Sequence, residues 1–526
     1  MIADTARRWW ALIAIAVCVL VVGLDLTVLN LALPTLARDL HASNGDLQWF
    51  ASVYSLTLAA ALLPGGLLGD RFGRKKVLLA ALAVFGVSSA ACAYSTSSGT
   101  LIAARAFLGL GAAAILPLSL SVLPVFFTDK ERPKAIAVIM GATFIGYPVG
   151  PLLGGWLLDN YWWGSVFLIN VPVVLLALAA VAVLLPESRA SKRPSLDVAG
   201  VLASSLGLAG LTYGLIRAGQ DGWSNAAALA AMAAGAVLLA GFVVWERRLT
   251  RRQAVQPLVE LSLFRSAGFT WGSVLTTLVS FALFGILFAM PQYFQEVRGL
   301  DAFGSGLRLL PMIVGLVAGM LGGTRLQSPR RGPGAPGVPP ASAKSLVTAG
   351  FAVMACALAA GTLTRVNSGS AATAVWFTAV GLGLGLALPA AMNAALGALT
   401  ADRSGAGSAL VSAMRQVGAT IGVAVLGTVL GSVYRGHLDV SRLSAQAAGV
   451  ARTSVTGGIA VASQSRSALP LDGVRTAFTD ALDTMLWVCA GIALAAAVLA
   501  LAFLPRRGRD VSAAEAEGAV PAQVTG

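Results

Sequence analysis

The sequence predicts an all-α polytopic membrane protein, and three observations support this fold class: the composition, the number of long apolar stretches and the position of the charges. Apolar residues make up 57% of the 526-residue chain, charged residues only 11%, and the mean hydropathy is +0.80. The exposed shell of a soluble protein must be polar, and soluble domains have about 25% charged residues. The composition therefore excludes a water-soluble enzyme, a disordered chain and a secreted disulfide scaffold.

Fourteen stretches are apolar and long enough to cross a bilayer. A helix needs about 20 mostly apolar residues to span a hydrocarbon core about 30 Å thick. The predicted spans are residues 10–32, 47–68, 77–95, 100–124, 135–158, 165–185, 198–217, 226–245, 270–292, 303–325, 345–364, 371–395, 408–433 and 484–504. The first span is too long for a signal peptide and contains Asp25, so we expect a retained helix.

The basic residues predict the orientation of the chain. The net charge of +14 would suggest nucleic-acid binding in a soluble protein. With a cytoplasmic N-terminus, however, about 25 of the 37 Lys and Arg residues fall on the inner side, as the positive-inside rule requires. The sequence therefore predicts both termini in the cytoplasm and no nucleic-acid partner. The Ala-, Gly- and Arg-rich composition favours a bacterial cell (inner) membrane.

The spans divide the chain into parts. Residues 1–185 hold spans 1–6, residues 186–268 hold spans 7 and 8 with their cytoplasmic linkers, residues 269–505 hold spans 9–14, and residues 506–526 form a cytoplasmic tail. The outer segment 434–483 is rich in Ala, Ser, Thr and Gly and is polar enough to stay outside the bilayer. It is either a loose loop or a short helical cap over an outer opening.

The loop between spans 2 and 3 contains several glycine and charged residues close together in the sequence. It reads Gly66-Leu-Leu-Gly-Asp70-Arg71-Phe-Gly73-Arg74-Lys75-Lys76. Gly73 can supply an unusual backbone angle in a tight turn, and the basic residues can pair with acids or lipid headgroups. We expect an inner-face charge network that locks one conformation, with the members Gly66, Asp70, Arg71, Gly73, Arg74, Asp129 and Glu131. The alternative is a solvated, positively charged turn.

Span 5 carries small residues at regular spacing. Gly146, Gly150 and Gly154 recur every four residues, with Pro151 and Gly155 beside them. Bare backbone along one helix face lets a neighbouring helix approach closely, and a proline removes one backbone donor and permits a bend. The pattern indicates a hinge or seal between two halves, or ordinary small-residue packing, and the two interpretations are compatible.

Asp25 is the carboxylate that lies well inside an apolar span. A charge in hydrocarbon is costly, so the group must face a cavity, pair or be neutral. Burial favours the protonated form of a carboxyl group, so a proton and a cationic substrate could compete for Asp25. Arg105 in span 4 can hydrogen-bond carbonyls near Asp25 and tune its proton affinity. The alternative for each residue is a structural hydrogen bond or ion pair.

Several residues could line an amphipathic pocket, although each could equally serve in packing. These candidates are Asn30, Trp49, Tyr54, Phe281, Phe284, Tyr293, Asn393 and Arg415. Spans 2, 10 and 13 offer no further acid near these positions, so divalent cationic substrates are not expected. The cysteines and histidines lack metal-ligand spacing, so no metal site is expected. No G-x-x-x-x-G-K-[ST] pattern is present, so we expect an ion gradient rather than ATP or a cofactor.

Together these motifs resemble those of the major facilitator superfamily. The loop after span 2 is similar to the family signature G-x-L-x-D-R-x-G-R-K, and span 5 is similar to the motif associated with exporters. Span 4 is similar to R-x-x-x-G-x-G, with Leu108 where the family usually has glutamine. Further segments resemble the fourteen-span drug/proton antiporter branch: Leu24 to Pro34, Trp162 to Pro172 and Arg415 to Gly422.

The resemblance implies a fold and an activity. It implies two pseudo-symmetric six-helix bundles, spans 1–6 and 9–14, plus two inserted helices, with substrate bound between the bundles. It further implies a monomeric, proton-coupled antiporter that exports amphipathic drugs or antibiotics, with Asp25 and Arg105 in coupling. A dedicated exporter of one metabolite, such as an amino acid or siderophore, is the alternative. A membrane enzyme or receptor would need a catalytic cluster or an output domain, and the sequence suggests neither.

Overall fold

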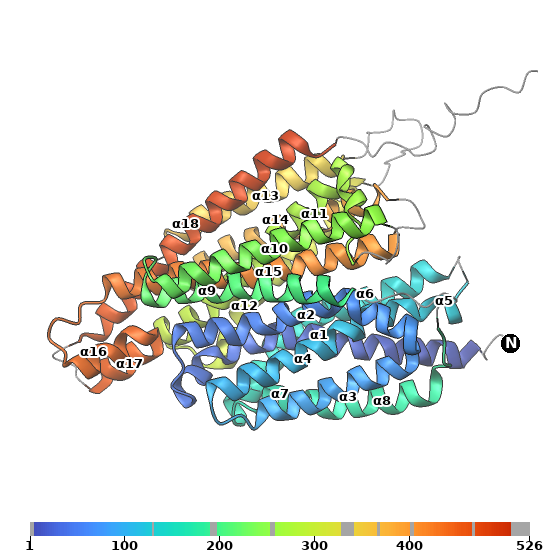
Figure 1. Ribbon diagram of the computed structural model, residues 1–526. Helices are drawn as coiled ribbons and strands as arrows, with labels where there is room; N and C mark the ends of the chain where they lie inside the picture. The colour runs from blue at the N-terminus through green and yellow to red at the C-terminus, as the bar shows by residue number, and fades with distance from the viewer. Residues whose placement is uncertain are drawn as a thin grey trace, which may run out of the picture.

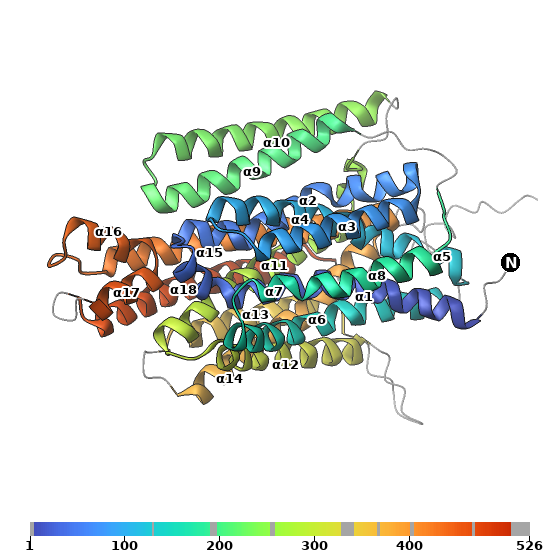
Figure 2. The same ribbon diagram turned by 90° about the horizontal axis from the view of Figure 1, so that it is seen from below.

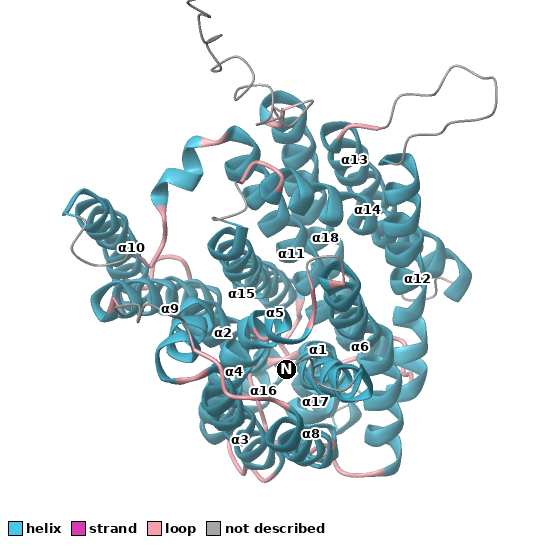
Figure 3. Cartoon of the chain, turned by 90° about the vertical axis from the view of Figure 1, so that its right-hand side faces the viewer, coloured by secondary structure: helices cyan, strands magenta, loops and turns pink. Residues whose placement is uncertain are grey.

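The computed structural model describes residues 5–128, 131–189, 197–252, 258–327, 341–364, 369–399, 404–464 and 469–505. Within these ranges the secondary structure is helical, without a strand, as Figure 3 shows. Thirteen helices of the described residues are long and apolar enough to cross a membrane. The remaining predicted span, 135–158, lies within a 29-residue helix. The prediction of an all-helical polytopic membrane protein is confirmed.

The chain forms two bundles and an inserted helix pair (Figure 1). The first bundle consists of α1 (Thr5–Asp39), α2 (Asn44–Phe72), α3 (Arg74–Ala93), α4 (Ser98–Ser121), α5 (Leu123–Phe126), α6 (Arg132–Asn160), α7 (Ser165–Leu168) and α8 (Asn170–Leu184). The inserted pair is α9 (Val198–Asp221) and α10 (Ala226–Arg252). The second bundle consists of η1 (Leu261–Arg265), α11 (Ala267–Gln292), η2 (Tyr293–Val297), α12 (Ala302–Gln327), α13 (Ala343–Gly361), α14 (Ser370–Leu396), α15 (Ser404–His437) and α18 (Leu471–Phe503), with the short helices α16 (Ala445–Thr453) and α17 (Val455–Gln464).

The two bundles meet along two seams, where α2 packs on α15 and α6 packs on α12. In Figure 1 the bundles lie close together at the end that carries α16 and α17, and they diverge toward the end that carries the N-terminus. We call these the α17 end and the N-terminal end. Hydrogen bonds join the bundles at the α17 end: Asn44 Nδ2 donates to the Gly427 carbonyl at 3.1 Å, and Gln295 Nε2 donates to the Leu31 carbonyl at 2.8 Å.

Asp159, the penultimate residue of α6, caps a helix of the other bundle. Its carboxylate accepts hydrogen bonds from the backbone N–H groups of Ala302 at 3.0 Å and Phe303 at 2.8 Å. The first N–H groups of a helix have no partner within that helix, and a negative charge is favourable there. Asp159 therefore ties the start of α12 to the first bundle at the α17 end.

The segment 434–483 is helical over most of its described residues. It contains α16, α17 and the first turns of α18, which begins at Leu471 rather than near the predicted residue 484. Tyr434 Oη donates to the Ala451 carbonyl at 3.1 Å, and α17 packs on α1, η2 and α18. The interpretation as a loose loop is therefore wrong for these residues, which form short helices packed on the bundles. Composition alone missed this because Ala-rich helices with small polar residues resemble loops in hydropathy.

The inserted pair lies along one side of the bundles, as Figure 2 shows. α9 packs on both α2 and α15, and α10 packs mainly on α9. Thr428 Oγ1 on α15 donates to the Leu215 carbonyl at 3.2 Å, and Gln220 Nε2 donates to Ser43 Oγ before α2 at 3.1 Å. The pair is thus attached to both bundles across one seam.

Bare backbone allows α12 and α14 to pack at very short range. A Cβ atom added at Gly315 would overlap the Thr378 carbonyl oxygen of α14, and one added at Gly381 would overlap the Met312 carbonyl oxygen of α12. Small residues permit this approach, which gains dispersion contacts between helices that have no hydrophobic drive to associate in lipid. In contrast, a Cβ atom at Gly322 on the same α12 would meet nothing within 4 Å.

We predict that Gly315→Ala destabilises the fold whereas the matched Gly322→Ala does not. The new methyl group at residue 315 must displace the α14 backbone, which costs about 1–3 kcal/mol as overpacking does elsewhere. At the open position 322, alanine is a better helix former than glycine by about 1 kcal/mol. Thermal unfolding in detergent checks both variants. Equal behaviour of the two would contradict the close packing of α12 on α14.

Candidate functional site

Asp25 and Arg105 form an ion pair in the interior of the first bundle. Their residues are only 3% and 1% exposed. Arg105 Nη1 donates to Asp25 Oδ2 at 3.4 Å, and Arg105 Nε donates to the Phe50 carbonyl on α2 at 2.7 Å. The pair thus links α1, α2 and α4, and it includes the backbone carbonyl contact that the sequence predicted for Arg105.

Aromatic rings enclose the guanidinium group of Arg105. Its Cζ atom lies 5.2 Å from the ring centroid of Tyr54 and 5.8 Å from that of Phe167. Cation–π attraction strengthens when the cation is shielded from water. Tyr54 was predicted as a pocket residue, but it is fully buried and its ring contacts Arg105. The rings therefore hold the arginine in place.

Asn170, at the start of α8, extends the network around Asp25. Its side chain lies close enough to the Asp25 carboxyl group to interact with it, and its Nδ2 donates to Ser89 Oγ on α3 at 3.1 Å. Ser89 Oγ in turn donates to the Phe167 carbonyl at 2.8 Å. The motif before α8 marked Asn170 as unusual, but nothing in its spacing showed that it reaches Asp25. Ser89 carried no signal in the sequence.

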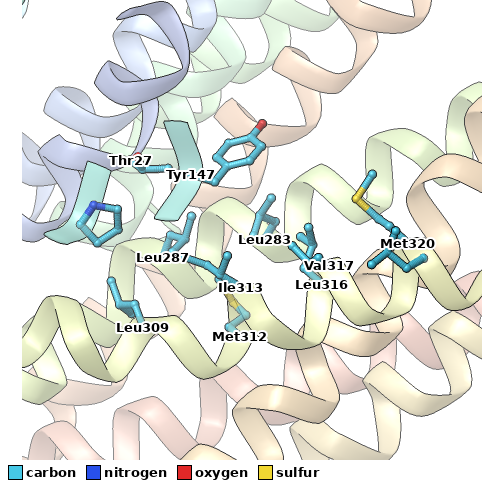
Figure 4. Close-up of a pocket in the computed structure, with 12 residues that line it drawn as sticks. Thr27, Tyr147, Leu283, Leu287, Leu309, Met312, Ile313, Leu316, Val317 and Met320 are labelled. Atoms are coloured by element: carbon cyan, nitrogen blue, oxygen red, sulfur yellow. The ribbon is translucent and has the colours of Figure 1, made fainter. Parts of the chain in front are cut away.

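A cavity of about 200 Å³ lies between the bundles. Figure 4 shows side chains from α1, α6, α11 and α12 around it. The lining residues are Thr27, Tyr147, Pro151, Leu283, Leu287, Leu309, Met312, Ile313, Leu316, Val317, Met320 and Leu321. Thr27 and Tyr147 are its polar members. The walls are otherwise apolar, and none of the residues named carries a charge, so the cavity fits an apolar or amphipathic molecule.

Thr27 and Asp25 lie on different faces of α1. Successive residues of an α-helix are rotated by about 100° about its axis, so the side chains of residues 25 and 27 point about 200° apart. Thr27 faces the cavity, whereas Asp25 points into the first bundle toward Arg105 and does not line the cavity. The expectation that a cationic substrate meets Asp25 directly has no support in this geometry. The same helix nevertheless carries the buried charge and one wall of the cavity.

The predicted pocket residues lie elsewhere. Asn30, Trp49, Tyr54, Phe281, Phe284, Tyr293, Asn393 and Arg415 do not line this cavity. Trp49 packs near Tyr213 of α9 with ring centroids 6.5 Å apart, Tyr293 is buried in η2, and Asn393 is exposed near the N-terminal end. Residue type cannot tell which helix face a side chain occupies, and aromatic rings serve helix packing as readily as ligand contact, so the sequence could not place these residues relative to the cavity.

The glycines of α6 face two different partners. Cβ atoms added at Gly146 and Gly154 would lie 3.0 Å and 3.1 Å from atoms of α1, and one at Gly150 would overlap Thr27 Oγ1. A Cβ atom at Gly155 would lie 2.7 Å from Phe303 Cα on α12. Three glycines thus press α6 onto α1, and the fourth lets it approach the other bundle. The motif lies at the seam between the halves, next to the cavity.

The charged loop between α2 and α3 joins elements of the first bundle. Arg74 pairs with Asp70 at 2.9 Å, and its Nη1 donates to the Ser121 carbonyl at the end of α4 at 2.8 Å. Gly73 has φ +115°, a conformation that favours glycine. Arg74 N also donates to the Ser188 carbonyl after α8 at 2.9 Å. This part of the predicted network is present. Gly66 lies nearby on α2, against Pro117 of α4.

The remaining members of that network lie apart from it. Glu131 pairs with Arg8 at 3.0 Å, not with the α2–α3 loop. Hydrogen bonds from the backbone and hydroxyl group of Thr128, together with Arg8, hold the pKa of Glu131 below its usual range. Arg71 lies over the Phe72 ring at 5.5 Å, and Asp129 is outside the described residues. The single network expected from the sequence is therefore two separate clusters.

In the described part of the chain, three acids besides Asp25 are buried: Glu296, Glu246 and Asp197, the last of which directly precedes α9. Glu296 in η2 is 8% exposed; Arg38 Nε lies 3.9 Å away, and Thr456 Oγ1 of α17 donates to it at 3.0 Å. Glu246 on α10 is fully buried. Glu296 and Glu246 both lie at the ends of apolar runs, where a sequence suggests contact with water. Glu296 is buried because α17 covers it.

Comparison with known proteins agrees with this architecture. The family model described as Major Facilitator Superfamily matches residues 15–423. The chain is 33% identical to the tetracenomycin C resistance and export protein of Streptomyces glaucescens, over 99% of this chain and 96% of that protein. It is 34% identical to the multidrug efflux pump LfrA of Mycolicibacterium smegmatis, over 94% and 96%.

Solved structures share the fold at low sequence identity. A bacterial homologue of the human lysosomal transporter Spinster, in an inward-facing and occupied conformation, aligns with a TM-score of 0.68 and 14% identity, over 95% of this chain and 97% of that one. A D-xylose–proton symporter aligns with a TM-score of 0.60 and 13% identity, over 95% and 99%. Because the family model covers residues 15–423 and relatives at 33–34% identity span nearly the whole chain, the chain belongs to the major facilitator superfamily of membrane transporters.

Proposed function

We propose that this protein is a proton-coupled antiporter that exports amphipathic drugs, antibiotics or related small molecules by alternating access. The proton gradient drives it, without ATP or a bound cofactor, and it acts as a monomer in a bacterial inner membrane. The observation that carries the proposal is the buried Asp25–Arg105 pair on a helix whose other face lines the cavity between the bundles. The names of the two relatives, an antibiotic export protein and a multidrug efflux pump, support export as its direction.

The coupling acts through the position of α1. A proton on Asp25 cancels its charge and removes the ionic part of its bond to Arg105, which then relies on the Phe50 carbonyl and the surrounding rings. Because Gly146, Gly150 and Gly154 hold α1 against α6, a shift of α1 reaches the seam between the bundles. Protonation of Asp25 and occupancy of the cavity then favour different arrangements of the bundles, which is the requirement for coupling.

The basic loops orient the transporter with both termini in the cytoplasm. The N-terminal end, where the bundles diverge, then faces the cytoplasm, and the α17 end faces outward. Cross-bundle bonds from Asn44, Gln295 and Asp159 hold the outer end closed. This arrangement is inward-facing, the state that takes up cytoplasmic substrate. Export requires these bonds to break and the inner ends to close.

We predict that Asp25→Asn abolishes transport driven by a pH gradient while leaving substrate exchange at equal pH intact. Asparagine keeps the size and the acceptor oxygen for Arg105 but carries no titratable proton. Uptake into inverted proteoliposomes, with and without an imposed gradient, separates the two activities. Asp439→Asn, in the exposed loop after α15, is the control and should behave as wild type. Full gradient-driven transport by Asp25→Asn would exclude the assigned role.

The apolar walls favour substrates with large hydrophobic surfaces and at most one positive charge. Burying a charge without a partner is costly, and the cavity lining offers no acid. A flat aromatic molecule with a few polar groups fits such walls, with Thr27 and Tyr147 as hydrogen-bonding partners. Dications fit them poorly.

We predict that Ile313→Trp reduces transport of the bulkiest substrates by roughly tenfold or more, because the new ring occupies the cavity. Val314→Trp is the matched control, since Val314 is the next residue on α12 but is 62% exposed and lies outside the lining. Initial rates for substrates of increasing size test the pair. An equal loss in both variants would show that the substrate does not use this cavity.

A dedicated exporter of one compound is the second candidate. Several relatives are named for a single compound, including the tetracenomycin C protein and the methylenomycin A resistance protein of Streptomyces coelicolor. A screen of candidate substrates, among them amino acids and siderophores, in proteoliposomes under a pH gradient separates the two proposals. Transport of one chemical class favours the dedicated exporter, and transport of unrelated amphipathic molecules favours multidrug export.

A further inference from the structure

Two acidic side chains of the inserted pair, α9 and α10, lie buried together where this pair reaches the N-terminal end of the molecule. Asp197 precedes the first residue of α9 and is 5% exposed, and Glu246 near the end of α10 is 0% exposed. Neither residue belongs to the cavity or to the Asp25 network. A buried carboxylate without a counter-charge is strongly unfavourable, so the pair requires a physical explanation.

The contacts of the two acids join three elements at one point. Asp197 Oδ1 accepts a hydrogen bond from the Gly200 N–H group at 3.0 Å, which caps α9. Both Asp197 oxygens also accept from Trp245 Nε1 of α10, at 3.0 and 3.1 Å. Glu246 Oε2 accepts from the Val259 N–H group at 3.3 Å. The pair thus connects α9, α10 and the segment 258–266 that leads into α11.

The two carboxyl groups also meet each other. A Cβ atom added at Gly200 would overlap Asp197 Oδ2 and lie 3.0 Å from Glu246 Oε1, so these two oxygens converge on the same point above the α9 backbone. The two carboxyl groups therefore face each other, within reach of a hydrogen bond once one of them carries a proton. Glu246 Oε1 receives no N–H or O–H from another group in the described part of the chain.

Basic side chains do not neutralise the pair within the described ranges. The ion pairs of these residues involve neither Asp197 nor Glu246. Among the side chains that the structure describes, the charged groups on the adjacent parts of α10 and the linker are Arg247, Arg248, Arg251, Glu260 and Arg265. All four arginines are exposed, where water screens them, and Glu260 accepts a hydrogen bond from Ser262 Oγ at 2.7 Å.

Two ionised carboxylates cannot hydrogen-bond to each other, because both only accept. Like charges at close range instead retain one proton between them, as in other paired carboxyl sites. We propose that Asp197 and Glu246 share one proton, forming a proton-binding site that fastens the inserted helix pair to the linker of the second bundle. The proton supplies the donor that the Glu246 Oε1 atom lacks in the surrounding structure.

The sharing makes this attachment depend on pH. With the proton bound, the site carries one negative charge, which the Trp245, Gly200 and Val259 N–H groups can stabilise. As pH rises the proton leaves, two buried negative charges repel, and the link from Glu246 to the linker weakens. The attachment is therefore present at lower pH and lost as pH rises. In the orientation proposed above, the site responds to cytoplasmic pH.

Infrared difference spectroscopy of the full-length protein during a pH titration tests the shared proton directly. The titration uses an Asp25→Asn background, which removes the proton proposed for that residue, and this protein should show a C=O band of a protonated carboxyl group that disappears as pH rises. Glu246→Gln should lack this band, and it should fold because glutamine can donate the same hydrogen bond to Asp197. Glu260→Gln, a neighbouring acid of the linker, is the matched control and should retain the band. An unchanged band in Glu246→Gln, or its loss in Glu260→Gln, would overturn the proposal.

A thiol reporter tests the consequence for the linker. Leu263→Cys places a buried thiol in η1, in a background where the exposed Cys356 is replaced by serine. Thiol reactivity itself rises with pH, so each labelling rate is divided by that of the same reporter in Glu246→Gln. This ratio should rise by up to tenfold per pH unit while the closed site still holds the proton, because opening then releases one proton, and it should level off once the closed site has lost it. A ratio independent of pH would contradict the pH-dependent attachment. Neither the infrared band nor the labelling ratio depends on transport activity. A negative result in either experiment would therefore contradict the shared proton without contradicting the proposed function.

Discussion

The first bundle is organised around one charge that cannot be left unpaired. Burial of an ion away from water costs several kcal/mol even after the protein relaxes. For an ion moved into a rigid interior of low dielectric constant, the idealised cost is of order 20 kcal/mol. Arg105 meets this cost with the Asp25 carboxylate, the Phe50 carbonyl and two aromatic rings. These partners come from different helices, so the position of the guanidinium group fixes α1, α2 and α4 relative to one another. A change in the charge of Asp25 therefore alters the interactions that position all three helices.

A change in the position of α1 reaches the cavity because α1 is closely packed on α6. The glycines of α6 leave no space between its backbone and α1, and Gly155 brings the same helix against α12 of the other bundle. Within the second bundle, α12 is packed equally closely on α14 through Gly315 and Gly381. The seams at the α17 end are joined by individual hydrogen bonds, such as those of Asn44 and Asp159, in addition to the close contact at Gly155. Such a molecule can separate along its seams while each bundle moves as a unit, as alternating access requires.

Hydropathy could predict the spans because a bilayer demands long apolar helices, and thirteen such helices are found among the described residues. The Asp25–Arg105 contact was also predictable, since intramembrane charges must find partners. The position and lining of the cavity could not be predicted from the sequence, because the helix face that a side chain occupies depends on how the helices cross. Trp49 and Tyr54 therefore pack within or beside the first bundle, and leucine and methionine side chains of α11 and α12 line the cavity instead. Glu296 and Glu246 were missed for a related reason: each ends an apolar run, and only tertiary packing by α17, α9 and the linker removes them from water.

In the proposed mechanism, Asp25 gives up its proton when substrate occupies a cavity that Asp25 does not touch. The most direct measurement is the number of protons released as substrate binds to the purified transporter in weakly buffered detergent solution, followed with a pH indicator. The wild type is expected to release about one proton per bound substrate and Asp25→Asn none, because occupancy of the cavity and protonation of Asp25 are linked in the proposed mechanism. Equal proton release by both proteins at equal substrate occupancy would contradict it.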